Sequence, residues 1–185
     1  FITADKYCGE IGFEQVGNSP VIFGGSGKLL LNTTGGITID AIGSAPCVIT
    51  NIAELTSDNI IIDAPNAGGF IIAQTRVRLT APAGDLSLSM AGMGDAVIKS
   101  RDIKLTAPNG EITVETSGND RVGALLGEEH WKSVDNPDEY NNAKVVIDSA
   151  KGCYLRNQNG AMVINGDLTV NNCENFQIRC GGFAV

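Results

Sequence analysis

The sequence predicts an all-β fold, a single-chain parallel β-helix (β-solenoid) that runs as one domain through residues 1–185. The main observation is an internal repeat. Residues 77–88 (VRLTAPAGDLSL) match residues 103–114 (IKLTAPNGEITV) without a gap, at an offset of 26 residues. The composition agrees, because 23 glycines stand beside only six phenylalanines, three tyrosines and one tryptophan. This balance is more typical of thin stacked coils than of a sandwich with a large aromatic core.

The repeat can be followed in both directions from an apolar residue that precedes each turn. Successive markers are 24, 24, 26, 42 and 23 residues apart, and they are Leu31, Leu55, Leu79, Leu105, Ile147 and Val170. These steps predict about six to seven coils of roughly 24 residues. The step of 42 residues equals one coil plus about 16 residues, which we assign to a loop inserted at residues 127–142. Counting back 24 residues from Leu31 reaches Tyr7 and predicts a partial first coil.

The register is expected to continue without a gap beyond the inserted loop. Residues 145–156 align on residues 103–114, and residues 168–179 align on residues 145–156. Each coil is expected to hold three short strands, because apolar and polar residues alternate in runs such as ITI, LSL, IKL and ITV. Residues 124–131 form the one stretch in which a helical turn is conceivable.

Proline and glycine mark the expected corners. Pro65, Pro82 and Pro108 each follow an alanine at a strand end, where a missing N–H does little harm. A glycine comes next at Gly68, Gly84 and Gly110, and Gly152 aligns with Gly110. We expect these glycines to supply positive φ angles where the chain turns.

Charge and length limit the classes of partner. The net charge of −8 argues against nucleic acid and against an anionic membrane surface. No apolar run approaches the 18 or so residues that a membrane span requires, so no membrane insertion is expected. The five cysteines lack the spacing of a zinc site, and no cofactor or metal is expected. They are read as free thiols, with one disulfide among Cys153, Cys173 and Cys180 as the alternative.

The inserted loop is the first candidate site, because loops that project from a rigid scaffold often carry function. It contains the only histidine and the only tryptophan of the chain. The candidate binding residues are Trp131, His130, Tyr140, Asp135, Asp138 and Glu139. The two aromatic residues suit a sugar ring, with carboxylates to bind its hydroxyls. Calcium binding by the acidic residues and a solvated loop without a ligand are the other two interpretations.

Charged residues on a solenoid face are the second candidate. Stacking at the coil period predicts a row of Glu54, Arg78 and Lys104. It also predicts Glu54–Arg78 and Arg76–Asp102 pairs, and it stacks Asp85 against Glu111, two like charges that would attract a cation. A general acid and base must face each other across a substrate, which no spacing shows, so no catalytic residue is assigned.

Residues 103–114 and the run VINGDLTV at residues 163–170 resemble segments of phage tail proteins, including the baseplate spikes of contractile tails. Repeats such as LSLS are similar to those of filamentous-haemagglutinin-type adhesins. The chain lacks the H-x-H iron motif of spike tips.

The resemblance implies a structural or receptor-binding part of a phage tail or tail-like particle, located in the virion or outside the cell. A secreted surface adhesin and a carbohydrate-active β-helix enzyme are the alternatives. The expected partners are other copies of the chain, packed end to end or side by side, neighbouring subunits, or a cell-surface glycan.

Overall fold

The computed structural model describes most of the predicted strands and their pairing. It describes residues 2–4, 10–15, 21–22, 27–41, 48–64, 71–90, 98–116, 125–127, 144–158, 163–165 and 167–181. In chain order the strands are β1 (Ile2–Ala4), β2 (Glu10–Gln15), β3 (Val21–Ile22), β4 (Lys28–Asn32), β5 (Gly36–Ala41), β6 (Val48–Thr56), β7 (Ile60–Ala64), β8 (Ile71–Thr80), β9 (Leu86–Met90), β10 (Ile98–Ser100), β11 (Asp102–Thr116), β12 (Leu125–Gly127), β13 (Lys144–Asn157), β14 (Val163–Asn165) and β15 (Asp167–Cys180).

The pairings recorded between these strands are parallel, and they fall into three rows. The first row runs β1, β4, β6, β8, β11, β13 and β15. The second row runs β2, β5, β7, β9, β11, β13 and β15. The third row runs β3, β6, β8, β10, β12 and β14. Parallel rows that share strands require a chain that winds around one axis, so the predicted all-β solenoid is confirmed.

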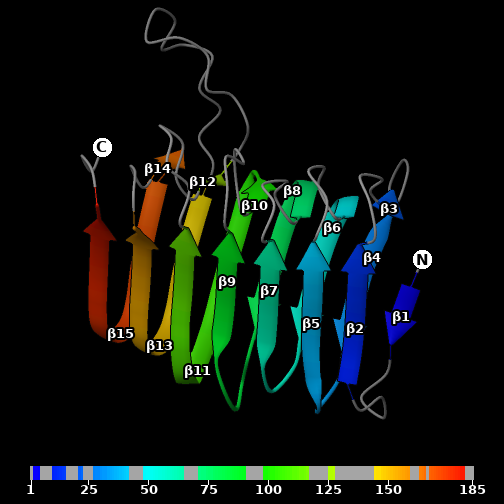
Figure 1. Ribbon diagram of the computed structural model, residues 1–185, viewed down its shortest axis with the longest axis horizontal. Coiled ribbons are helices and arrows are strands. Elements are labelled where there is room, and N and C mark those ends of the chain that lie inside the picture. The colour runs from blue at the N-terminus through cyan, green and yellow to red at the C-terminus, as the bar shows by residue number, and fades with distance from the viewer. Residues whose placement is uncertain are drawn as a thin grey trace, which may run out of the picture.

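The rows extend along the long axis of the molecule. Figure 1 shows the strands of the second row side by side, with β1 and β2 at one end and β15 at the other. Long strands bend from one row into the next. In β11, for example, Ile103 pairs with Val77 of β8, whereas Ile112 pairs with Leu86 of β9. A single long strand therefore belongs to two rows.

The core consists of apolar side chains stacked along the rows. The marker residues are direct register partners from Leu31 to Leu55, Leu79, Leu105, Ile147 and Val170. The first five are at most 3% exposed. Strand alternation explains this burial, because every second side chain points to the same face. The spacing of the markers, including the step of 42 residues, is confirmed.

Two details of the predicted register are wrong. Tyr7 was expected to lie one coil before Leu31, but the register partner of Leu31 is Ala4. The alignment of residues 145–156 on 103–114 holds from Ile103 but then slips by one residue, so that Val114 pairs with Leu155. The corner before Cys153 is one residue shorter than the corner before Ile112. The slip keeps apolar side chains on the buried face, since a register error of one residue would expose all of them.

Glycine is required at the corners for a different reason from the one expected. Neither Gly84 nor Gly110 has a φ angle in the left-handed range of +20° to +160°. A β-carbon on Gly84 would lie 2.1 Å from the Asn59 side-chain oxygen, and one on Gly110 would lie 2.1 Å from the Gly84 carbonyl oxygen. Close stacking, rather than chain reversal, therefore requires glycine. Positive φ occurs instead at Ser149 (61°) and Asn172 (52°).

Two smaller expectations also change. Within the stretch 124–131, residues 125–127 form strand β12, which pairs with β10 and β14, rather than a helical turn. The other residues of this stretch lie outside the described residues. Pro108 lies within the long strand β11 rather than after it. The alternation of buried and exposed residues is nevertheless interrupted at Pro108 and Asn109, which are both exposed.

Candidate functional site: charged rows and the open C-terminal end

The charged row along the first row of strands has the predicted register but different ion pairs. Glu54, Arg78 and Lys104 are stacked as expected. The ion pairs, however, run diagonally: Arg76 Nη2 lies 2.5 Å from Glu54 Oε1, and Arg78 bonds to the carboxylate of Asp102. Arg78 Nη1 also donates to the Asp102 carbonyl oxygen at 3.2 Å. The predicted Glu54–Arg78 and Arg76–Asp102 pairs are wrong, because long side chains lean along the strand and reach diagonal neighbours.

The same surface continues across β13 and β15. Lys104 Nζ lies 2.6 Å from Asp148 Oδ2, and Asn172 Nδ2 donates to Asp148 Oδ1 at 3.3 Å. The hydrogen bond from Lys104 lowers the pKa of Asp148 below its ordinary value. Partial burial raises this pKa, and the hydrogen bond from Asn172 lowers it further. These contacts hold Asp148 as a carboxylate and tie neighbouring strands together.

The stack of Asp85 and Glu111 has a structural explanation. Asp85 Oδ1 accepts a hydrogen bond of 2.8 Å from the backbone N–H of Glu111, and the N–H of Asp85 donates to Asn59 Oδ1 at 3.0 Å. Each side chain therefore satisfies the backbone of the next layer at the same corner. In the described ranges there is also no cluster of three or more histidine, cysteine or acidic residues that could hold a metal ion.

The candidate residues of the inserted loop lie outside the described residues. These are Trp131, His130, Tyr140, Asp135, Asp138 and Glu139. Gly127, where the loop was expected to begin, is the last residue of β12. The sugar, calcium and solvated-loop interpretations of this segment therefore stay predictions.

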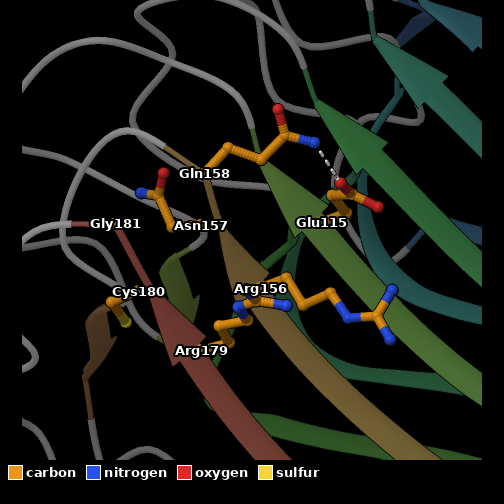
Figure 2. A pocket seen from close by; sticks show the side chains of 7 residues that line it. All are labelled: Glu115, Arg156, Asn157, Gln158, Arg179, Cys180 and Gly181. Atoms are coloured by element: carbon orange, nitrogen blue, oxygen red, sulfur yellow. Dashed lines mark hydrogen bonds between the residues drawn. The ribbon is translucent and has the colours of Figure 1, made fainter.

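Sequence reasoning missed a groove near the C-terminal end of the rod. Its volume is about 510 Å³, and Figure 2 shows its lining: Glu115, Arg156, Asn157, Gln158, Arg179, Cys180 and Gly181. The Gln158 amide donates to the Glu115 carboxylate. The Arg156 guanidinium lies 4.7 Å from the centroid of the Tyr154 ring, a cation–π contact. The signal for this groove was present in the sequence, because Arg156 and Arg179 are equivalent positions in the aligned segments.

The groove borders a strand whose apolar side chains are uncovered. Phe176 and Ile178 of β15 are 41% and 46% exposed, whereas their register partners Cys153 and Leu155 are completely buried. Among the described strands β15 pairs with β13 alone. The outer edge of β15 thus presents free backbone N–H and C=O groups next to an open core.

The cysteines of this region are thiols. Cys153, Cys173 and Cys180 are all free, so the alternative of a disulfide among them is wrong. Burial raises the pKa of the Cys153 thiol to about 12, with a smaller contribution from nearby Cys173. Cys153 is therefore an unreactive core residue, since the thiolate is the reactive form.

The fold and this end define the chain as a β-solenoid protein with an uncovered terminal strand. No protein-family model matches the chain, and no curated protein or solved structure shows significant similarity to it. In the part of the chain that the structure describes, no helix is long and apolar enough to cross a membrane. Function must therefore be argued from the geometry.

Proposed function

We propose that this chain is a structural or receptor-binding β-helix component of an extracellular assembly, most simply a phage tail or tail-like particle, and that it performs no catalysis. The observation that carries the proposal is the uncovered strand β15, whose core residues Phe176 and Ile178 are roughly half exposed. An open core and a free sheet edge, as β15 presents among the described strands, are suited to being covered by a neighbouring subunit. A part that is stacked in a larger assembly has such a neighbour.

We further infer that the solenoid consists of six to seven coils of about 24 residues, each with three short strands. Residues 127–142 would then be a loop of about 16 residues inserted into the single domain 1–185. The pairing of Leu105 with Ile147 supports the insertion, because residues 42 positions apart occupy neighbouring layers.

The contacts of the described carboxylates support a role without catalysis. Asp102, Asp148 and Glu54 are paired with cations, and Asp85 accepts a backbone N–H. Side chains held in this way are suited to joining strands rather than to exchanging protons with a substrate. Binding of a glycan by the inserted loop remains compatible with this role.

Light scattering and negative-stain electron microscopy of the purified chain test the proposal. We expect a stable oligomer or an end-to-end rod, and a monodisperse monomer would overturn the structural role. Phe176→Asp should dissociate the assembly, because it places a charge in the open core. Ile61→Asp is the matched control: Ile61 is 49% exposed on the outer face of β7, away from the ends, and its replacement should leave an end-to-end assembly intact. Dissociation by Ile61→Asp alone would indicate side-by-side packing.

The loop residues are tested separately. If the loop binds a glycan, Trp131→Ala should abolish retention on a glycan array while the melting temperature changes little, because an aromatic ring that stacks on a sugar contributes to binding rather than to the core. Unchanged retention would remove Trp131 from the site.

A further inference from the structure

We propose that the outer edge of β15 binds the N-terminal end of a second copy of this chain, head to tail and in register. This inference rests on the proposed assembly and adds which surfaces meet and in which orientation. The partner strands would be β1 and β2, which pair on one side only among the described strands. The parallel rows would then continue from one copy into the next.

The apolar rows carry the first argument. One inward row contains Ile11, Ile37, Ile60, Leu86, Ile112, Cys153 and Phe176, in that order along the rod. Each member stacks on the next, and the five members between the two ends are at most 1% exposed. Another copy placed in register would set its Ile11 over Phe176, and so provide the apolar neighbour that Phe176 lacks. The same step would place Ile2 beside Leu168, since these residues are the first and last register positions of another row.

Charge complementarity carries the second argument. An outward row, which we call the acidic-to-basic row, contains Glu14, Asp40, Asp63, Ser89, Glu115, Arg156 and Arg179. It begins with carboxylates at the N-terminal end of the rod and finishes with two guanidinium groups at the C-terminal end. Glu14 and Arg179 are both exposed, and Arg179 makes no ion pair within the described residues. Head-to-tail stacking would place Glu14 of the second copy beside Arg179.

The geometry also selects the orientation. A tail-to-tail junction would join two β15 strands in antiparallel pairing and would offer Arg179 no carboxylate from this row. A head-to-tail junction keeps the parallel pairing found along the rod and pairs opposite charges. Such an interface uses two different surfaces, so it does not close on two copies and instead predicts linear growth.

Charge reversal tests the proposal in solution. We expect Arg179→Glu and Glu14→Arg each to weaken self-association by roughly tenfold in sedimentation velocity, because each places like charges at the junction. The chain carrying both substitutions should recover wild-type association, and so should a mixture of the two single variants. Circular dichroism provides the check on folding, since both positions are exposed.

A disulfide provides an independent readout of the register. Gln15 follows Glu14 in β2 and Cys180 follows Arg179 in β15, so Gln15 and Cys180 are each one residue beyond the two ends of the acidic-to-basic row. In an in-register junction Gln15→Cys would therefore lie beside Cys180 of the next copy, across one strand spacing. Strand β2, which contains Gln15, and strand β15, which contains Cys180, lie at opposite ends of the rod in one chain (Figure 1), so only two copies can join these positions. Oxidation should give a ladder of covalent multimers on a non-reducing gel. Gln15→Cys combined with Cys180→Ser is the matched control and should give no ladder.

The outcomes separate this inference from the proposed assembly. A wild-type monomer overturns both. An oligomer that neither charge reversal weakens, or that the double substitution fails to restore, overturns the head-to-tail junction and leaves the assembly role standing. Absence of the Gln15→Cys ladder in an assembled sample likewise overturns the in-register contact, because neighbouring strands bring α-carbons within disulfide distance.

Discussion

Gly110 stacks on Gly84 so closely that a β-carbon on Gly110 would lie 2.1 Å from the Gly84 carbonyl oxygen. The obstacle is backbone, which cannot move aside as the end of a flexible side chain can. This contact joins two successive corners of the rod at the point where the two copies of the repeat turn.

We therefore expect Gly110→Ala to lower the free energy of unfolding by about 3 kcal/mol, the upper part of the range for overpacking. Gly12→Ala is the matched control, because a β-carbon there would meet nothing within 4 Å. Alanine in a strand interior should stabilise the chain at that site by about 0.5 kcal/mol. Urea unfolding measures both. Equal effects at the two positions would contradict the close approach of the corners.

The end of the core gives a second prediction. Leu155 is completely buried, whereas its register partner Ile178 is 46% exposed. Leu155→Ala should cost about 2–5 kcal/mol by leaving a cavity, while Ile178→Ala should cost only about 1 kcal/mol in the dissociated chain. Thermal unfolding at low protein concentration measures the difference. A similar loss for both substitutions would mean that β15 is covered even at low concentration.

Backbone strain gives a third prediction at a corner of β13. Ser149 has a φ of 61°, a conformation that costs a residue with a β-carbon about 1 kcal/mol. Ser149→Gly should therefore raise the stability by up to about 0.5 kcal/mol, after allowance for the greater freedom of glycine in the unfolded chain.

Asn172 of β15 is the control for Ser149, because its φ of 52° is also positive. Asparagine tolerates this conformation, and its Nδ2 donates to Asp148. Asn172→Gly should accordingly be neutral or destabilising. Calorimetry of both variants measures the effect, and a loss of stability in Ser149→Gly would show that its side chain matters more than the strain.

The pH dependence of stability gives a fourth prediction. Burial raises the pKa of Cys153 from 9.0 to about 12. A raised pKa means that its contribution to stability is complete below about pH 9 and is lost as the pH rises toward 12, because the unfolded thiol ionises first. Over this window the loss approaches about 1.4 kcal/mol per pH unit.

Cys153→Ala isolates this contribution, since the variant and the wild type differ only in this ionisable group. The variant should be less stable than the wild type at pH 8, through the lost side-chain volume, and should lose less stability between pH 9 and 11. Urea unfolding across this range measures the two slopes. Identical slopes would show that the thiol is not buried in the folded chain.

The prediction of the fold from sequence worked where one residue type recurs on a buried face. The series from Leu31 to Val170 identified six layers of the first row, and its 42-residue step correctly joined Leu105 to Ile147. Apolar burial is periodic and dominates the free energy of stacking, so a one-dimensional pattern is sufficient to detect it.

The prediction of ion pairs on the surface was less successful. The stacking of Glu54 on Arg78 was correct, but the bond from Arg76 to Glu54 depends on how a long side chain leans.

By itself the sequence determined that the chain is a solenoid, that its repeat survives a long interruption, and which residues line the core. Only the tertiary structure decided that the register slips before Cys153, that Gly110 is needed for close contact, and that acidic and basic residues separate along one outward row. The physical reason is that a repeat records what every layer shares. A slip, a close backbone contact and a gradient of charge are differences between layers, and they become visible only when the layers are stacked.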